Sequence, residues 1–436
     1  MNISDSERVI TVLNEMGMTR TENEEEASLL GIVACSVRQK AIDKVYSRIH
    51  KWNQWKHRKP LLTFVSGCIL PADRYKFLKL FDLVFPMNEV TGLPEMIKQY
   101  GIITPMGFHA SSSEGGISDF WKIAPRYNSN FEAYVPIQNG CDKFCTFCAV
   151  PYTRGREVSR PSHEILTEVK ELVMKGYKTI TLLGQNVNSY GLDKGGEEIA
   201  FHELLRQIGE FGKQSGKQFW TYFTSPHPRD MSRNVIDVIA SYPVLAKQIH
   251  LPLQSGDDMV LIHMNRKYKL DEYREVVAYI RHKLPTATLF TDIITGFSGE
   301  TDDQFLNTVK AMQEFQYNMA FIAVYSPRPG AVSSRWADDV PYQLKKQRLH
   351  KLTEEVEKSS FKYNQSLIGE TLQVLVIDKD RKGEYLSGVT EGKVNVRIAS
   401  FDESLIGNFV RIKMTGAIEF SIAGELVFAE TLEEVE

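Results

Sequence analysis

The chain has little cysteine and no long apolar segment. Only five cysteines occur in 436 residues, and an odd number behind a polar start argues for a reducing compartment rather than a disulfide framework. No apolar run approaches the ~20 residues that a membrane-spanning helix needs. Residues 1–6 have the pattern of neither a signal peptide nor a transit peptide. We therefore expect a cytoplasmic protein with no membrane partner.

The chain also lacks a strong net charge. The formal net charge is -3, so the overall field does not attract a polyanion, and any RNA contact must come from local patches. The 42% of hydrophobic residues is enough for buried cores, and a chain of this length is expected to hold about two or three domains.

Three of the five cysteines lie in one octapeptide, Cys141-Asp-Lys-Phe-Cys145-Thr-Phe-Cys148. Thiolates are the usual ligands of iron–sulfur clusters, and three of them on a four-iron cube leave one iron open for a small molecule. A zinc site would recruit a fourth Cys or His close by, but the nearest histidine, His163, lies beyond a Pro-Tyr-Thr-Arg-Gly turn. The spacing therefore favours an iron–sulfur cluster over zinc. A disulfide is the least favoured of the three.

The segment 135–161 around these cysteines resembles the radical S-adenosylmethionine (SAM) signature of the methylthiotransferase family. Further motifs follow in the family's order: Leu182-Leu-Gly184-Gln-Asn186, Thr224-Ser-Pro-His-Pro228, His250-Leu-Pro-Leu-Gln254-Ser-Gly256, Met264-Asn-Arg266-Lys-Tyr268 and Thr295-Gly-Phe-Ser-Gly-Glu-Thr301. The resemblance spans nearly the whole chain. It is strongest to the branch that modifies adenosine in transfer RNA, the tRNA-2-methylthio-N6-dimethylallyladenosine synthases.

The resemblance implies an enzyme that converts N6-isopentenyladenosine next to the anticodon of tRNA to its 2-methylthio derivative. Two SAM molecules would be used per turnover, one to methylate cluster-borne sulfur and one to supply a 5′-deoxyadenosyl radical, a reaction that no side chain performs. Threonylcarbamoyladenosine in tRNA is an alternative substrate. A ribosomal-protein substrate is less favoured, because residues 151–155 and 250–256 follow the tRNA branch.

The resemblance also implies which residues contact SAM. No side chain is assigned a catalytic role, because the clusters and SAM carry the chemistry. Phe147 would lie against the adenine and Arg266 close to the carboxylate, while the glycine would permit close backbone approach. Each residue has a structural alternative, such as filling a core or satisfying backbone at a strand end. The expected SAM contacts are Phe147, Gly184, Gln185, Asn186, Gln254 and Arg266.

The other two cysteines, Cys35 and Cys68, each end an apolar, strand-like run. That equivalence suggests one shared site, although either alone could be a small buried hydrophobe. By resemblance they bind an auxiliary [4Fe–4S] cluster that supplies the sulfur.

The family has a third N-terminal cysteine, in a Gly-Cys-Gln-Met-Asn stretch, and this chain begins at the equivalent of the Met-Asn. We expect the natural enzyme to carry the complete auxiliary site, with Ser4 capping the first helix. The alternative is a tRNA-binding homologue impaired in sulfur insertion, whose two-thiolate cluster would be incomplete.

The chain is predicted to be of the α/β class. Apolar runs alternating with amphipathic helices predict parallel strands at 134–138, 179–183, 220–224, 248–253, 288–294 and 319–325. Six such units indicate a partial (β/α)6 barrel of the TIM type, with working residues at the carboxyl ends of the strands. Four parts are expected: a Rossmann-like methylthiotransferase domain lacking its first strand (1–107), a linker (108–130), the radical SAM domain (131–368) and a TRAM domain (369–436).

Short β runs after residue 369 predict a small β-barrel, which resembles the RNA-binding TRAM module. Its charge does not favour RNA binding, because residues 370–436 carry seven Lys/Arg against thirteen Asp/Glu, and backbone-binding surfaces need clustered cations. A purely structural β cap is the alternative.

The best local RNA footprint is the stretch 38–60, which has eight Lys/Arg and a single acidic residue, interleaved with Tyr46, Trp52 and Trp55. The alternative is a solvated helix face with Trp52 turned inward. Besides tRNA, the expected partners are a flavodoxin- or ferredoxin-like electron donor and a donor of sulfur or clusters. The protein is expected to be a monomer.

Overall fold

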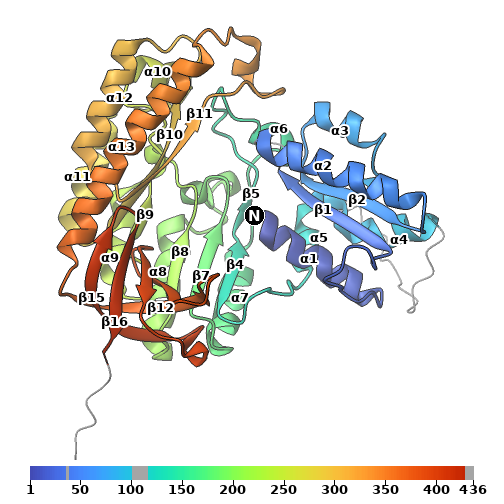
Figure 1. Cartoon of the computed structure of the whole chain (residues 1–436), viewed down its shortest axis with the longest axis horizontal. Helices are drawn as coiled ribbons and strands as arrows, with labels where there is room; N and C mark the ends of the chain where they lie inside the picture. Colours follow the sequence, from blue (N-terminus) through green and yellow to red (C-terminus); the bar gives the residue numbers. More distant parts are fainter. Residues whose placement is uncertain (36–38, 101–115, 428–436) are drawn as a thin grey trace, which may run out of the picture.

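The computed structural model describes residues 1–35, 39–100 and 116–427. Figure 1 shows an N-terminal α/β unit beside two central sheets, with a C-terminal β-barrel packed under the central sheets. Within the described residues, no helix is both long enough and apolar enough to span a bilayer. The predicted linker falls partly outside the description, and α5 (Ile117–Lys122) buries Phe120 and Trp121 in the N-terminal core.

The N-terminal unit is built on a parallel sheet of β1 (Leu29–Cys35), β2 (Leu62–Cys68) and β3 (Leu83–Val84) in that order. Every residue of the central strand β2 is buried, as expected for a parallel strand covered on both faces. The helices around this sheet are α1 (Asn2–Glu15), α2 (Gln39–Lys56), α3 (Pro71–Phe77), η1 (Met87–Gly92) and α4 (Leu93–Gln99).

Helix α1 begins one turn earlier than expected. Its N-cap is Met1, so Ser4 lies inside the first turn and not at the cap. The Ser4 hydroxyl instead accepts a hydrogen bond from Nη1 of Arg8 at 2.7 Å. The expected cap is wrong because the helix begins before Ser4, and the buried side chain of Arg8, one turn later in the same helix, engages the hydroxyl.

The six predicted central strands are present and parallel. They form two sheets, β4 (Glu132–Pro136), β7 (Thr179–Leu183) and β8 (Trp220–Phe223) in one, and β9 (Gln248–His250), β10 (Thr288–Thr295) and β11 (Met319–Val324) in the other. A backbone bridge between Thr221 and Leu245 joins β8 to the segment leading into β9. The predicted α/β class is therefore confirmed.

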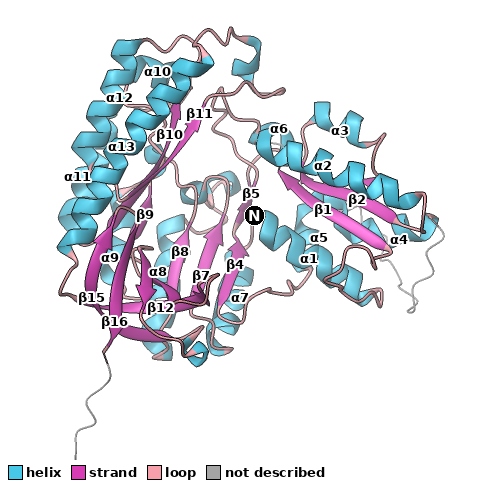
Figure 2. Cartoon of the chain, in the orientation of Figure 1, coloured by secondary structure: helices cyan, strands magenta, loops and turns pink. Residues whose placement is uncertain are grey.

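Helices cover the outer face of these sheets (Figure 2). The covering helices are α7 (Ser162–Met174), α8 (Phe201–Ser215), α9 (Arg233–Ser241), α11 (Leu270–Lys283), α12 (Asp302–Phe315) and α13 (Tyr342–Ser366). Short elements fill the loops: β5 (Gln138–Asn139), α6 (Val150–Arg154), β6 (Val158–Ser159), η2 (Val187–Ser189), η3 (Leu192–Lys194), η4 (Pro228–Asp230), α10 (Asp258–His263) and η5 (Val332–Arg335).

The C-terminal strands close into a small barrel, as predicted. Its strand order is β12-β13-β14-β16-β15, and closure leaves no unpaired sheet edge. The elements are β12 (Thr371–Lys379), β13 (Leu386–Thr390), β14 (Asn395–Ile398), η6 (Glu403–Leu405), β15 (Phe409–Ile418) and β16 (Ser421–Leu426).

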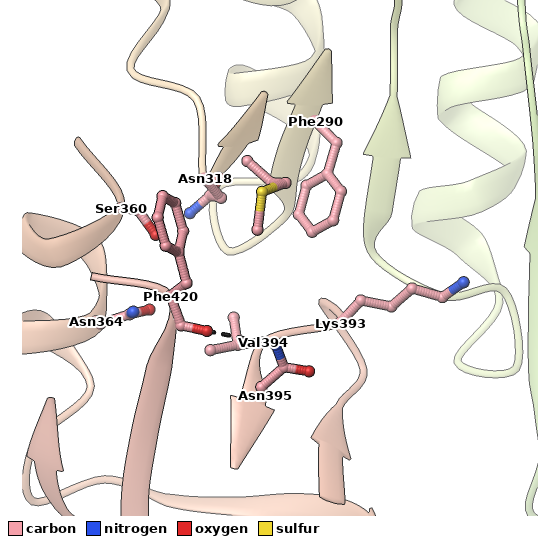
Figure 3. Close-up of a pocket in the computed structure, with 9 residues that line it drawn as sticks. Phe290, Asn318, Ser360, Asn364, Lys393, Val394, Asn395 and Phe420 are labelled. Atoms are coloured by element: carbon pink, nitrogen blue, oxygen red, sulfur yellow. Dashed lines mark hydrogen bonds between the residues drawn. The ribbon is translucent and has the colours of Figure 1, made fainter. Parts of the chain in front are cut away.

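This barrel packs on the end of the central sheets where the strands begin. Trp220, the first residue of β8, lies against Phe409 with ring centroids 4.6 Å apart. Thr288, the first residue of β10, donates a hydrogen bond to the carbonyl of Gly392 at 2.7 Å. Figure 3 shows a cavity at this junction, and its volume of about 20 Å³ admits only a water molecule. The opposite end of the sheets is left for the loops that follow the strands.

We predict that Trp220→Ala will destabilise this junction. Trp220 is 5% exposed and its cluster includes Tyr222 and Leu375, and removing a buried Trp side chain costs about 3–5 kcal/mol. The first unfolding transition in urea should shift accordingly. The control is Phe401→Ala, which removes an aromatic ring that is 73% exposed and should leave the transition in place. Equal shifts for the two variants would contradict the packing described.

Candidate functional site

The three clustered cysteines lie in the loop between β5 and α6, which we call the cysteine loop (residues 140–149). Gly140 opens it with φ +80°, and a Cβ there would lie 2.0 Å from the carbonyl oxygen of Arg156, so only glycine fits. The loop is held against the segment after α10, because Asn265 Nδ2 donates to the carbonyl of Phe144 at 2.9 Å. The loop is therefore shaped by backbone packing.

The cysteines of the loop are partly or fully buried. Cys145 is buried, Cys141 and Cys148 are half-buried, and burial raises the pKa of Cys141 to about 11 and that of Cys148 to about 12. Cys145 Sγ accepts a hydrogen bond from Arg266 Nη1 at 3.3 Å. The three thiols are a soft ligand set, and one of them accepts a hydrogen bond from an arginine.

The donor set suits a cluster better than a single ion. Among the described residues, no three His, Cys, Asp or Glu side chains converge as ligands of one metal ion. A four-iron cube places each thiolate on a different iron and needs no fourth protein ligand when a small molecule takes the last iron. The loop therefore fits the predicted [4Fe–4S] cluster.

Two of the predicted SAM contacts have roles within the fold. Phe147 is half-buried and meets Phe297 edge to face, with centroids 6.5 Å apart. At Gly184, after β7, a Cβ would lie 2.9 Å from Gln138 Oε1, so the close approach there is made by Gln138. Contact with SAM stays a prediction for both residues.

Asn186 joins two loops at the carboxyl ends of the strands. Its Oδ1 accepts a hydrogen bond from the backbone N–H of His227 at 3.1 Å, and its Nδ2 donates to Asp230 at 2.9 Å. Asn186 is 1% exposed, and both polar atoms of its side chain are already hydrogen-bonded within the protein. The geometry supports the structural alternative for Asn186.

Gln185 and Gln254 differ from Asn186 in having polar atoms to spare. Gln185 Oε1 is buried without a partner in the described part of the chain, a costly state unless a ligand supplies a donor. Gln254 has φ +74°, and such strain in a non-glycine residue often marks a functional position. Among the described residues, its side chain makes no hydrogen bond, so it too can meet a ligand.

Arg266 is buried, and two of its nitrogens are already hydrogen-bonded within the protein. Its Nη2 donates to the carbonyl of Pro252 at 2.8 Å, while its Nη1 is the donor to Cys145. Arg266 nevertheless lines a cavity of about 280 Å³ beside the cysteine loop, and we call this the cationic cavity. Its lining residues are Asp142, Lys143, Phe144, His227, Arg229, Asn265, Arg266 and Lys267.

Sequence reasoning did not predict that the residues of the cationic cavity come together. Lys143, Arg229 and Lys267 come from three separate loops, and no spacing in the sequence connects them. Lys143 pairs with Asp230 at 2.6 Å, which in turn holds Asn186. Most of the lining residues lie in three motifs singled out in the sequence, the Cys141–Cys148 octapeptide, Thr224–Pro228 and Met264–Tyr268, and among the lining residues Arg229 alone lies outside them. The cavity gathers positive charge where an anionic ligand could enter.

The remaining cysteines are brought together by the N-terminal sheet. β1 and β2 are parallel and their last residues, Cys35 and Cys68, are register partners, and neighbouring strands lie about 4.8 Å apart. Cys68 is buried and Cys35 half-buried. The shared position agrees with the predicted site, and their role as cluster ligands stays a prediction. Arg154 at the end of α6 donates its Nε–H to Cys68 Sγ at 2.8 Å.

Part of the basic stretch 38–60 is engaged within the N-terminal unit. Trp52 is 2% exposed, and its indole N–H donates to Glu24 at 3.4 Å. Arg48 pairs with Glu24, and Lys56 pairs with Asp82 at 2.6 Å. Trp52 is therefore turned inward, as in the structural alternative, whereas Arg48 and Lys51 stay more than half exposed, and RNA binding by this stretch stays a prediction. Arg38 itself lies outside the described residues.

Comparison with known proteins gives consistent similarities. Residues 135–312 match the Radical SAM superfamily, and residues 1–86 match the family described as "Uncharacterized protein family UPF0004". The tRNA-2-methylthio-N(6)-dimethylallyladenosine synthase of Clostridium perfringens strain SM101 is 39% identical, covering 98% of this chain and 95% of the relative. That of Chromobacterium violaceum is 36% identical, covering 99% and 97%.

Among solved structures, the cobalamin-dependent S-adenosylmethionine radical enzyme OxsB is similar with a TM-score of 0.50 and 12% identity, over 80% of this chain and 53% of that one. At this identity the similarity concerns the fold alone. It agrees with the central α/β architecture described above.

We predict that His227 makes the protein acid-sensitive. Burial, and then the charge of Arg266, lower the pKa of His227 to about 2, whereas unfolded histidine titrates near 6.5. Below about pH 6.5 the unfolded state therefore binds the extra proton, and stability falls as the pH drops. In urea unfolding of the metal-free protein, His227 should contribute a loss of roughly 2 kcal/mol between pH 7 and pH 5.

The comparison variant is His227→Gln, which cannot titrate. Its free energy of unfolding should fall less than that of the parent over the same pH interval, by about the stated amount. Identical pH dependence in the two proteins would show that His227 is not held neutral in the folded state.

Proposed function

The chain belongs to the family of tRNA-2-methylthio-N(6)-dimethylallyladenosine synthases, and we propose that it is a radical SAM methylthiotransferase that converts N6-isopentenyladenosine next to the anticodon of tRNA to its 2-methylthio derivative. The observation that carries the proposal is a near full-length match, at 39% identity, to relatives named for this product. The cysteine loop at the carboxyl end of the parallel strands supports it with a suitable donor set.

The proposal assigns the radical SAM cluster, a [4Fe–4S] cluster, to Cys141, Cys145 and Cys148, with SAM on the iron that lacks a thiolate. When bound there, the cluster and SAM supply the radical chemistry that protein side chains cannot perform. Arg266 donates to the sulfur of Cys145 at 3.3 Å, and hydrogen bonds to sulfur tune such clusters. Gln185 and Gln254 would bind SAM through their uncommitted polar atoms.

The proposal assigns a second, auxiliary [4Fe–4S] cluster, the source of the sulfur, to Cys35 and Cys68. The N-terminal unit would then be the Rossmann-like methylthiotransferase domain, since two parallel strands deliver both thiols to its carboxyl edge. An electron donor of the flavodoxin or ferredoxin type and a sulfur or cluster donor complete the scheme as predictions.

RNA binding is proposed for two surfaces. The cationic cavity would receive phosphate near the target adenosine, because Arg229 and Lys267 are exposed there. The C-terminal barrel would act as the TRAM module, and Arg411 and Lys413 are exposed on one face of β15, two residues apart. Since the barrel packs where the central strands begin, bound tRNA would extend along the molecule from one end of the sheets to the other.

The function is tested with anaerobically reconstituted protein, a reductant, SAM and tRNA carrying N6-isopentenyladenosine. Nucleoside mass spectrometry should detect the 2-methylthio derivative, and Cys145→Ala should abolish both this product and reductive SAM cleavage, because one ligand of the cube is gone. Unmodified tRNA and tRNA carrying threonylcarbamoyladenosine should give no methylthio product. Product from threonylcarbamoyladenosine alone would replace the proposed substrate, and 5′-deoxyadenosine formation by Cys145→Ala would refute the cluster assignment.

The RNA-binding role of the barrel is tested by reversing charge on its surface, because deleting the barrel would uncover Trp220. We predict that Arg411→Glu with Lys413→Glu weakens tRNA binding and lowers the salt dependence by about 1–2 in log–log slope, while SAM cleavage without RNA is unchanged. The matched control reverses Lys283 and Lys310, exposed on α11 and α12, and should have little effect. Equal losses from both pairs would mean that only net charge matters.

A further inference from the structure

Arg154 connects the two cysteine sites. It ends α6, which directly follows the cysteine loop, and its guanidinium reaches into the N-terminal unit. Nε donates to Cys68 Sγ at 2.8 Å, and Nη2 donates to Asp5 Oδ2 at 2.5 Å. Nη1 donates to Asn139 Oδ1 at 3.1 Å. One side chain therefore contacts β2, α1 and β5 at once.

This contact is buried and leaves the guanidinium little freedom. The side chain of Arg154 is 6% exposed and that of Asp5 is 0% exposed. Nη2 also donates to Asn2 Oδ1 at 3.3 Å, and Asn139 Nδ2 donates back to the carbonyl of Arg154 at 3.0 Å. A planar guanidinium whose N–H groups donate to fixed partners holds those partners in one geometry. A lysine ammonium cannot reproduce this arrangement.

The two sites share a second feature, an arginine that donates to a cysteine sulfur. Arg266 does so at Cys145 and Arg154 does so at Cys68. The two arginines are not equivalent, because Arg266 is held within the central unit by the carbonyl of Pro252, whereas Arg154 crosses from the central unit to the N-terminal one. Only the second contact can set the position of one site relative to the other.

We propose that Arg154 is a positioning residue for sulfur insertion: it holds Cys68, and with it the auxiliary cluster, in a fixed position against the radical-cluster loop. The inference rests on the proposed function, because it takes Cys35 and Cys68 as ligands of the auxiliary cluster. Outer-sphere donors to metal ligands influence both binding and potential. Loss of Arg154 should therefore impair the auxiliary cluster and its use while leaving radical formation intact.

The test compares Arg154→Gln and Arg154→Lys with the parent protein in the reconstituted form. Reductive SAM cleavage without RNA should be unchanged in both variants. The ratio of methylthio product to 5′-deoxyadenosine should fall by about 10-fold or more in Arg154→Gln, the usual effect of removing an outer-sphere partner. Arg154→Lys keeps a positive charge beside Asp5, so the fold is retained. Because one ammonium cannot contact both Asp5 and Cys68, the product ratio should fall in this variant too.

A second readout separates positioning from a merely structural role. In a background with Cys141, Cys145 and Cys148 all replaced by Ala, only the auxiliary cluster remains, and its midpoint potential can be followed by electron paramagnetic resonance. Arg154→Gln and Arg154→Lys should both shift it to more negative values, because the N–H donor to sulfur is lost. The control is Arg156→Gln, since Arg156 is on the same segment but 75% exposed and paired with Asp142, and it should not shift the potential.

Each outcome decides the question. Parent-like product ratios and potentials in Arg154→Lys and Arg154→Gln would overturn the inference. If the background with Arg154 intact binds no iron, Cys35 and Cys68 do not hold a cluster in this chain and the inference fails. If the parent protein binds both clusters yet makes no methylthio product from any tRNA, the proposed function fails, whereas the potential shift still reports the Arg154–Cys68 contact.

Discussion

Parallel strands end on the same side of their sheet, and both cysteine sites depend on this constraint. In the N-terminal sheet it places Cys35 beside Cys68. In the central sheets it gathers the loops after β7, β8 and β9 around the cysteine loop, which follows β4 and β5. Figure 1 shows the carboxyl end of β1 next to α6, the helix that follows the cysteine loop. The two carboxyl ends therefore meet at α6, and the Arg154–Cys68 contact at 2.8 Å lies between them.

The same constraint places the cysteine loop and the C-terminal barrel at opposite ends of the central sheets. The barrel is attached where the central strands begin, through Trp220 and Thr288, so its docking surface does not compete with the loops that form the site. Helix α13 runs along the central sheets, from the end where their strands finish to β12 of the C-terminal barrel (Figure 1). Near its start, Arg348 pairs with buried Glu300 at 2.7 Å, and Glu300 accepts from the backbone of Gly296 at 2.7 Å. One helix thus braces the loop after β10 and carries the barrel.

Local patterns in the sequence were enough for the six central strands and the closed barrel, because each strand is an apolar run with turn residues on both sides. The Cys141–Cys148 spacing was enough for a soft three-thiolate set. Contacts between segments distant in the sequence could not be predicted from such local patterns. Asn186 is engaged by His227 and Asp230, and Glu24 and Asp82 neutralise cations of the stretch 38–60. Such pairs follow from tertiary packing, which no single spacing encodes.

The central claim is that the two cysteine sites face each other across one buried seam. Its most direct test is electron paramagnetic resonance of the fully reduced, reconstituted protein. Two clusters held close together should give a spectrum broadened by mutual spin coupling, which collapses to a simple single-cluster spectrum in Cys68→Ala. A spectrum equal to the sum of two independent clusters, each obtained separately from cysteine variants, would contradict the account.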